Sequence, residues 1–558
     1  MQYTREGTKY QQQDYTFFNE QYATSTHQKD HDMNPSLIVQ PKGDDDVVKT
    51  ILWAQKNNVA VAVKSGGHQY SGASSTGGKN IQLDLSNTYK DMMVFNPNGN
   101  TDKTYVYAGV SNQLKDFNAY LTHNGLFVPH GQCAYVCVGG HAQTGGYGQL
   151  GRSFGLFGDH IRTIRMFDYN GKLQEVTKDS DAELFYAILG GSPGNFGIIT
   201  HYVVEVHQAT DYMGTVVGPN KFKGPHYFKG LWLYSPDVLK QLLTYVAKMS
   251  DDANFPRNYD LCVSVLSTDF PVSILFPELA DASVMEKVLA KIKSHFADEF
   301  LSYLNGRFPA IIVVYAQWCP FSKTDVYDTT VDNWFAQFRA LGGLLDDLSL
   351  SQQEADSNMA DITGLWIFPK EREFNLPYVK RTYATNMRNL STNGWVDTVV
   401  QRLDLIYNEN NYLQGNEGER GYERYLSCKL SVQIQNYGGK FAKFTTNKDN
   451  GTSYSWRDSS MVQTLDCFHN DDDKSKAYAE QWAAKNDTLM NGASGLFSPV
   501  DKRVLWGSWG DWNLGDEKVW KCYYEDEAMY QKVGAQRAKW DPNGTFTPNP
   551  FAVTAFKG

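Results

Sequence analysis

The sequence lacks any apolar run of about 18 residues, the length that a transmembrane helix requires. It also lacks an excess of basic residues, since the net charge is −10 at pH 7. Nucleic acids and anionic membranes are bound by basic surfaces, so we expect neither as a partner. The first 18 residues are polar and contain no apolar segment of the kind that marks a signal peptide, although this absence leaves the compartment open.

Metal-binding patterns are missing as well. The seven cysteines are scattered and form no Cys-x-x-Cys pair, so the sequence predicts no zinc site and no other metal site. Their odd number leaves at least one thiol outside any disulfide. A ligand site must therefore be sought in another kind of motif, and the glycine-rich turns are the candidates.

An α/β pattern begins after about 35 polar residues. Residues 36–40 predict a strand, 44–58 an amphipathic helix and 59–63 an apolar strand that leads directly into the turn Ser65-Gly66-Gly67-His68. A glycine turn after a strand often holds phosphate through backbone N–H groups. This turn matches neither the dinucleotide fingerprint nor the phosphate loop of nucleotide triphosphatases, so by itself it is weak evidence.

The most glycine-dense stretch runs from His130 to Asp159 and also contains a cysteine, two histidines and a tyrosine among its glycines. Glycine lets a backbone approach a bulky ligand and adopt positive φ angles. Successive exposed N–H groups form a cradle for anions or for polar ring edges. The stretch predicts a ligand site, and the alternative is a long connector between strands.

Length and texture indicate more than one domain. The chain has 558 residues, 41% of them hydrophobic and 14% aromatic, which is enough for two to four globular domains. A third glycine turn, at 190–200, leads into a strand. After about residue 208 glycine motifs become scarce, and after about residue 495 the chain becomes rich in tryptophan and glycine. These changes predict a separate domain over 208–490.

Four motifs taken together are specific: SGGHxxxG at 65–72, GxCxxVxVGGHxxxGGYG at 131–148, GGxxGNFGIIT at 190–200 and WDPNGTF at 540–546. On these motifs the chain resembles the berberine bridge enzyme-like flavoprotein oxidases, which have the vanillyl-alcohol oxidase fold. The resemblance implies an α+β protein with an FAD-binding domain in two parts, 1–207 and 491–558. It places a substrate-binding domain at 208–490, built on an antiparallel sheet backed by helices.

The resemblance also implies two covalent bonds to FAD. His68 stands where the family bonds a histidine to the flavin 8α-methyl group, and Cys133 where many members bond a cysteine to flavin C6. The alternatives are a polar turn residue for His68 and a buried free thiol for Cys133. Cys137 is expected in the core, and His141 is expected to be structural. Further residues expected at the cofactor are Lys64, Ser65, Gly66, Gly67, Gln69, Gly72, Gly131, Val136, Gly139, Gly140, Gly146, Gly197, Ile199, Tyr523 and Tyr524.

The residues at the positions of the catalytic base differ from those in two branches of the family. Gln435 replaces the glutamate of one branch, and Trp509 replaces the tyrosine of the Asn-Tyr-x-Asp motif in another. A third branch pairs a tyrosine and a glutamine at the positions of Tyr147 and Gln435, but its lysine is Gln433 here. A free tyrosine has a pKa near 10, so Tyr147 needs help to act as a base. The alternatives are a ring packed on the flavin for Tyr147 and a solvated strand residue for Gln435.

The residues Trp509 and Asp511 are expected to line the substrate pocket, with a loop anchor as the alternative role for Asp511. Val136 stands where a valine accompanies oxidase activity in the family and a larger residue accompanies dehydrogenase activity. The resemblance therefore implies an FAD-dependent oxidase that passes hydride from an alcohol to flavin N5 and reduces O2 to hydrogen peroxide.

Three functional hypotheses stay open. The first is the oxidase, whose alcohol is a carbohydrate, an aromatic or allylic alcohol, or a secondary metabolite. A second hypothesis is a dehydrogenase or oxidative cyclase with low oxygen turnover, and a third is a flavin-loaded binding protein. We expect a monomer that takes a small-molecule substrate and O2. Family resemblance implies secretion, whereas the sequence shows no signal peptide, so the compartment stays open.

Overall fold

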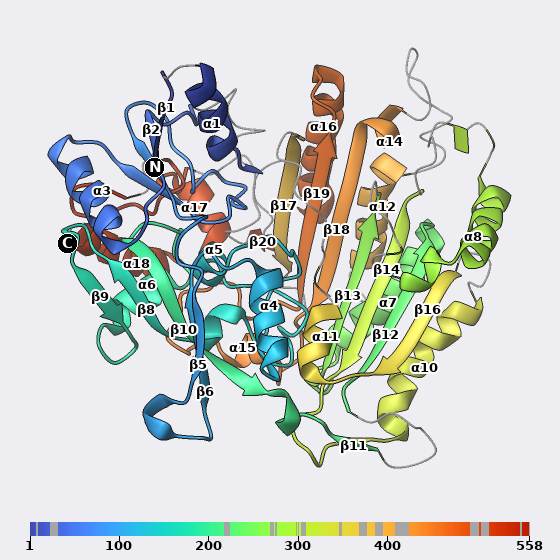
Figure 1. The fold of residues 1–558 in the computed structure, drawn as a ribbon. Coiled ribbons are helices and arrows are strands. Elements are labelled where there is room, and N and C mark those ends of the chain that lie inside the picture. Colours follow the sequence, from blue (N-terminus) through green and yellow to red (C-terminus); the bar gives the residue numbers. More distant parts are fainter. Residues whose placement is uncertain are drawn as a thin grey trace.

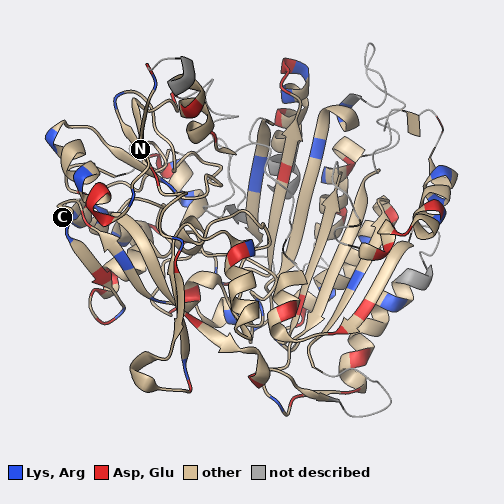
Figure 2. Ribbon diagram, viewed as in Figure 1, with Lys and Arg blue, Asp and Glu red and all other residues tan. Residues whose placement is uncertain are grey.

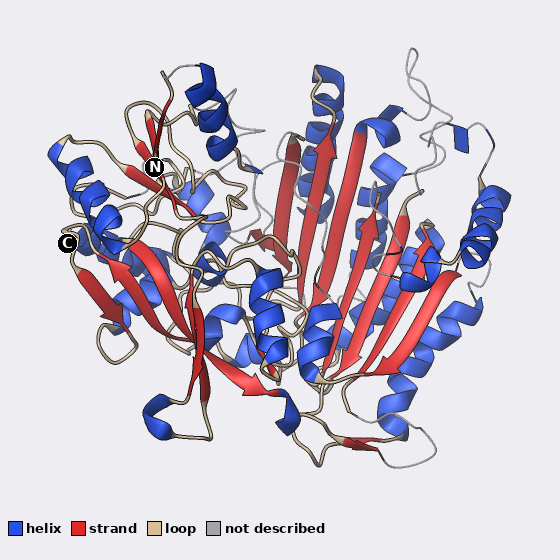
Figure 3. Cartoon of the chain, in the orientation of Figure 1, coloured by secondary structure: helices blue, strands red, loops and turns tan. Residues whose placement is uncertain are grey.

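The computed structural model describes residues 1–6, 9–22, 32–216, 224–267, 276–296, 309–344, 349–365, 376–385, 394–407, 423–491, 501–503, 513–546 and 549–556, with a few single positions between them. Within these ranges the chain forms four sheets, of four, six, two and eight strands, with helices packed against them (Figures 1 and 3). The predicted α+β class is confirmed.

The first sheet matches the predicted α/β opening. Three of its strands are parallel, and a fourth, at the N-terminus, pairs antiparallel with β2. Helix α3 (Asp44–Lys56) connects two of the parallel strands; its first turn holds three aspartates, which complement the helix dipole. The strands lie in the order β1 (Gln2–Thr4), β2 (Leu37–Val39), β4 (Ile81–Asp84) and β3 (Val61–Lys64). Helix α1 (Lys9–Asn19) precedes this parallel part.

The six-stranded sheet follows, and short helices surround it. Its path is β5 (Met92–Phe95), β6 (Thr104–Gly109), β10 (Ile198–Gln208), β8 (Ile161–Phe167) and β9 (Leu173–Val176), with β7 (Leu126–Phe127) pairing β10. The associated helices are α4 (Leu114–His123), α5 (Val138–Gln143) and α6 (Ala182–Ile188).

The C-terminal segment returns to these N-terminal elements (Figure 1). The backbone of Val61 forms a parallel bridge with Phe546, and its N–H donates to the Thr545 carbonyl at 2.7 Å. Helices α17 (Glu517–Tyr523) and α18 (Glu527–Trp540) belong to this segment, and α18 packs on α6. One hydrophobic core contains apolar side chains from both ends of the chain. The exact division at residues 207 and 490 stays a prediction.

The eight-stranded sheet is antiparallel throughout and is built from the middle of the chain. Its order is β16 (Ser349–Asp356), β12 (His226–Leu233), β14 (Ile311–Trp318), β13 (Tyr259–Leu266), β18 (Cys428–Asn436), β19 (Met461–His469), β17 (Tyr378–Thr385) and β20 (Asp501–Arg503). Helices associated with it include α7 (Pro236–Asp251), α8 (Ala282–His295), α10 (Thr329–Leu344), α12 (Trp395–Tyr407), α14 (Glu423–Ser427) and α16 (Asp473–Asn491). Helix α11 (Met359–Leu365) packs on α4 and β7, and α15 (Lys443–Thr446) contributes Phe444 to the core shared by both ends of the chain.

The two faces of this sheet differ because successive side chains of a strand point to opposite sides. On β18, Val432 and Ile434 are fully buried in the core that includes residues of α7, α12 and α16. Their neighbours Gln433 and Gln435 line a cavity on the other face. The part of the sheet around β18 therefore presents polar side chains toward the glycine-rich turns, whereas Leu231 of β12 and Val313 of β14 belong to a separate apolar core.

Basic and acidic residues are interspersed over the fold (Figure 2). None of the described helices combines the length and the apolar character needed to cross a membrane. All seven cysteines are free thiols, and six of them are buried.

Candidate functional site

A cavity of about 370 Å³ lies between the glycine turns and the polar face of the large sheet. Its walls come from segments far apart in the sequence: the turn after β3, the stretch before and through α5, the start of β10, and strands β13, β14, β17, β18 and β19. Fifteen of the predicted site residues line it: Ser65, Gly66, Gly67, His68, Gln69, Gly131, Cys133, Val136, Gly139, Gly140, Gly146, Tyr147, Gly197, Ile199 and Gln435.

Four predicted cofactor residues lie away from the cavity wall. The Lys64 ammonium donates to the Phe18 carbonyl at 2.6 Å and pairs with Asp84 at 3.4 Å, so it ties the first sheet together. Gly72 presents its carbonyl to the Asn549 amide at 2.9 Å. Tyr523 and Tyr524 are buried in the core. The two predicted pocket residues, Trp509 and Asp511, lie outside the described residues.

Close packing explains the glycines of the first motif. A Cβ on Gly66 would lie 3.0 Å from the Cys137 Sγ and 3.1 Å from its backbone nitrogen. Gly67 has a φ of 64°, in the region where side chains are strained. The turn after β3 therefore packs directly against the start of α5, and larger residues would separate the two glycine segments.

His68 faces the cavity with an unsatisfied nitrogen. Its Nε2 is buried and has no hydrogen-bond partner among the described residues. A Tyr22 ring lies edge-on at 5.2 Å between centroids and supports the imidazole. Buried nitrogens of His160 and His207 also lack a partner, so what distinguishes His68 is its place on the cavity wall. A group bound in the cavity would lie beside this imidazole.

Cys133 is the cysteine with an exposed side chain, because it faces the open cavity. The surrounding protein still removes most water from the thiol, and this burial raises its pKa to about 11. The Tyr135 backbone N–H and the Lys380 charge act in the opposite direction. Cys137 is buried, as expected for a core residue, and burial raises its pKa to about 12.

His141 holds the glycine stretch together. Its Nε2 accepts a hydrogen bond from the Gly131 N–H at 2.9 Å. Burial, with a smaller contribution from the neighbouring His130, lowers the His141 pKa to about 3. Burial likewise lowers the His160 pKa to about 4. Both imidazoles are therefore neutral at pH 7.

We expect these two histidines to make the fold sensitive to acid. Their folded pKa values lie below about 6.5, the unfolded value, so only the unfolded chain takes up their protons as the pH falls from 6.5 toward 4. At pH 5 the loss of stability is about 2 kcal/mol for each histidine. Urea unfolding at pH 7.5 and pH 5 measures it. His160→Gln removes one of the two contributions, so its loss of stability between pH 7.5 and pH 5 should be smaller than that of the wild type. A wild-type urea midpoint that is the same at pH 5 as at pH 7.5 would contradict the prediction.

Tyr147 and Gln435 lie on opposite walls of the cavity and are linked through Tyr437. The Tyr437 hydroxyl lies 2.8 Å from the Gln435 Oε1 and 2.9 Å from the Gly148 carbonyl, with both as acceptors, and it accepts from the Gly148 N–H at 3.1 Å. The Tyr147 ring lies 6.0 Å from that of Tyr437. Burial raises the Tyr147 pKa above its ordinary value, and the Arg457 charge opposes this shift. The phenol is protonated at neutral pH.

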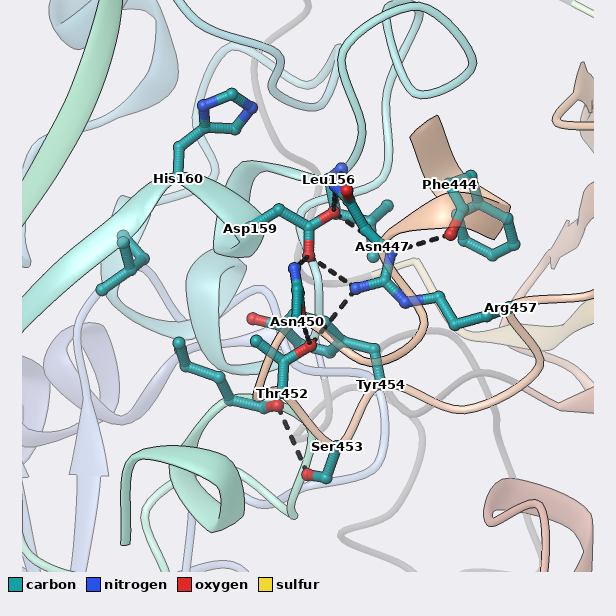
Figure 4. A network of polar contacts seen from close by, with 12 residues as sticks. Leu156, Asp159, His160, Phe444, Asn447, Asn450, Thr452, Ser453, Tyr454 and Arg457 are labelled. Atoms are coloured by element: carbon teal, nitrogen blue, oxygen red, sulfur yellow. Dashed lines mark hydrogen bonds and ion pairs between the residues drawn. The ribbon is translucent and has the colours of Figure 1, made fainter. Parts of the chain in front are cut away.

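Arg457 belongs to a buried network of polar contacts (Figure 4). Its guanidinium donates to both carboxylate oxygens of Asp159, at 3.1 and 2.5 Å. The side-chain amides of Asn447 and Asn450 donate to the same carboxylate at 2.9 and 2.8 Å. The Leu156 N–H adds another bond at 2.9 Å. This network attaches the loop after α15 to the glycine-dense stretch.

Several cavity residues were not predicted from the sequence. Gln433 donates from its amide to the Gln132 Oε1 at 2.9 Å, at the position where the family pattern has a lysine. Lys380 and Asp466 form an ion pair on neighbouring strands, directly opposite each other in the β17–β19 register. The available signal was the alternation of polar residues along 428–436, which marks one face of that strand; residues 461–469 show no such alternation.

Comparison with known proteins agrees with this geometry. Residues 35–177 match the family described as the FAD binding domain. The match lies in the N-terminal part of the chain and includes the first two glycine motifs. An FAD-linked oxidoreductase of Dictyostelium discoideum is 34% identical over 210 residues, which are 37% of this chain and 44% of the relative. Berberine bridge enzyme-like 12 of Arabidopsis thaliana is 32% identical over 173 residues, 31% of this chain and 32% of the relative.

These alignments confirm the predicted resemblance of the FAD-binding chain to berberine bridge enzyme-like proteins. Each covers less than half of the curated relative. The solved structure of a glucooligosaccharide oxidase from Acremonium strictum, with a 6-S-cysteinyl, 8α-N1-histidyl FAD, has a TM-score of 0.66. It covers 100% of this chain and 98% of that chain, at 14% identity. At this identity the likeness establishes the fold alone.

Proposed function

We propose that this protein is an FAD-dependent oxidase of alcohols with its flavin bonded to both His68 and Cys133. The observation that carries the proposal is the cavity itself. It brings together a histidine with an orphaned buried nitrogen and the one cysteine that is exposed, from turns 65 residues apart, inside a fold that carries an FAD binding domain.

The residues around the cavity suit an isoalloxazine ring. Glycine turns bring backbone N–H groups close to the ligand, and Gly139 and Gly197 leave no side chain in the way. A bound flavin supplies the hydride acceptor for alcohol oxidation. The chain supplies the walls that position the alcohol, the group that takes its hydroxyl proton and the access for O2, for which Val136 on the cavity wall is the candidate.

The polar face of the large sheet favours a substrate with several hydroxyl groups. Amides and hydroxyls of Ser264, Gln433, Gln435 and Thr464 line the cavity together with aromatic rings such as Tyr315. Hydrogen-bonding side chains beside aromatic faces suit a carbohydrate, in keeping with the oligosaccharide oxidase of the same fold. Aromatic or allylic alcohols and secondary metabolites are the alternative substrates.

Two candidates exist for the group that accepts the proton. Tyr147 with Gln435 stays the prediction from sequence, although burial holds the phenol in its protonated form. Asp466 is the one carboxylate among the described residues that line the cavity. Burial raises its pKa, while the Lys380 charge lowers it. A general base must lie within hydrogen-bond reach of the proton that it accepts, so substitution of each candidate separates them.

Acid precipitation of the purified protein tests the covalent flavin. We expect the flavin to stay with the precipitated wild-type protein and to remain attached, through the other bond, in both His68→Ala and Cys133→Ala. The double variant should release all of it to the supernatant. Peptide mass spectrometry then identifies each linked residue, and free flavin from the wild type would refute covalent attachment.

A panel of sugars and aromatic alcohols with a peroxide read-out tests the oxidase. Peroxide production with any member supports the proposed activity. Flavin that is reduced by an alcohol but reoxidised slowly by O2 in stopped flow would favour the dehydrogenase or oxidative cyclase. Flavin that no alcohol reduces would favour a binding role. The predicted monomer can be checked by light scattering of the same sample.

A further inference from the structure

Lys380 occupies an unusual place for a lysine. It lies in the middle of β17, its side chain is 2% exposed, and it lines the cavity that holds His68 and Cys133. Lysine is rarely buried without a paired charge. Here the pairing comes from Asp466, directly opposite on β19, so the position of the ammonium is held by the sheet register.

The same ammonium contacts the segment that carries His68. The Lys380 Nζ lies 4.0 Å from the centroid of the Tyr70 ring, within the range of a cation–π interaction. The Tyr70 ring also stacks on Tyr22 at 4.8 Å, and the Tyr22 ring lies beside His68. Lys380 is therefore held between the sheet and the first glycine turn, at the wall shared by both predicted flavin links.

Cys133 needs such a cation if it is to react. A thiolate, and not a thiol, is the nucleophile in cysteine chemistry. Burial raises the Cys133 pKa to about 11, so the thiolate is scarce at neutral pH. The Tyr135 backbone N–H and then the Lys380 charge act against this shift, while the Asp466 charge adds to it, so Lys380 is the cation that lowers the Cys133 pKa. Reactive cysteines are typically partly exposed and lie beside a lysine, arginine or protonated histidine.

We propose that Lys380, held by Asp466 and Tyr70, is the positioning residue that activates Cys133 for its bond to the flavin. The inference rests on the proposed function, since it assumes that Cys133 is a flavin link. In the step, the Cys133 sulfur loses its proton and forms a bond to a ring carbon, which loses its own hydrogen as a proton. Both protons go to solvent. The two electrons pass through the ring to dioxygen, which takes up two protons from solvent and becomes hydrogen peroxide.

Alkylation of Cys133 measures this bond without any substrate. Protein that is incompletely loaded with flavin is incubated with FAD in air, sampled over time, denatured, treated with iodoacetamide, digested and analysed by mass spectrometry. A linked Cys133 peptide carries flavin, whereas a free one carries the alkyl group. In Lys380→Met we expect Cys133 to link at least about tenfold more slowly than in the wild type, because each unit of pKa is a tenfold change in thiolate.

Three further measurements make the outcome decisive. Lys380→Arg keeps the charge and should restore the linking of Cys133. Lys429→Met removes a second cavity lysine, on β18, and Cys133 should then link at the wild-type rate. The His68 peptide should carry flavin in every variant, which reports an intact cavity.

Several results would overturn the inference. Equal linking rates of Cys133 in Lys380→Met and the wild type would overturn it. Loss of both flavin links in both Lys380→Met and Lys380→Arg would also overturn it, because Lys380 would then be needed for folding. A Cys133 that is alkylated even in the fully loaded wild type would instead refute the doubly linked flavin of the proposed function, and with it the role of Lys380.

Discussion

Replacing Tyr147 with phenylalanine should slow reduction of the flavin by an alcohol substrate by about 10²–10⁴-fold, with the flavin absorbance spectrum intact. The change removes one hydroxyl from the cavity wall and keeps the ring that packs near Tyr437. The measurement is anaerobic stopped-flow reduction with the best alcohol of the panel. Because the phenol is protonated at neutral pH, the rate of the wild type should also rise with pH.

Two other variants show what the result means. Tyr107→Phe removes the same atom from a tyrosine on β6, outside the cavity, and should leave the rate unchanged. Asp466→Asn removes the carboxylate on the opposite wall. An unchanged rate in Tyr147→Phe together with a large loss in Asp466→Asn would assign the proton to Asp466 and reject Tyr147 as the base.

Replacing Arg457 with methionine should lower the free energy of unfolding by about 3–5 kcal/mol, because it leaves the Asp159 carboxylate buried without its counter-charge. The side chains of this pair are 1% and 2% exposed. The asparagine amides and the Leu156 N–H remain as donors, but they do not neutralise the carboxylate. Urea unfolding at pH 7.5, followed by fluorescence, measures the difference.

A surface pair provides the control for this prediction. Arg162 pairs with Glu205 at 2.6 Å, with side chains 33% and 25% exposed, so water screens the interaction. Arg162→Met should cost less than about 1 kcal/mol. If Arg457→Met were no more destabilising than Arg162→Met, the buried network of Figure 4 would not be a major source of stability. Asp159→Asn with Arg457→Met should recover part of the loss, since the uncompensated charge is then gone.

Local sequence patterns predicted the opening of the fold well. The strand, helix and strand expected at 36–40, 44–58 and 59–63 appear as β2, α3 and β3 with shifts of one or two residues at their ends. Such patterns depend on neighbouring residues alone: the acidic first turn of α3 and the apolar side that it buries are visible in the sequence. The glycine motifs were equally visible, because close packing and positive φ angles exclude other residues.

The wall of the cavity opposite the glycine turns was not predictable in this way. Lys380 and Asp466 are 86 residues apart in the chain, and they meet because β17 and β19 pair in one register. A slip of one residue would turn both side chains into the apolar core. Tyr523 and Tyr524 are predicted at the cofactor from the family pattern; they are buried in the core, and their contact with FAD stays a prediction.

The sequence by itself determined an α/β opening and a set of glycine turns with His68 and Cys133 at defined places, because those requirements are local and sterically strict. Only the tertiary structure decided which side chains face those turns. Long-range strand pairing placed Gln433, Gln435, Lys380 and Asp466 on one polar face, and the packing of distant segments set the burial that shifts the pKa values of Tyr147 and Cys133. Burial and register depend on the whole fold, so no single stretch of sequence contains them.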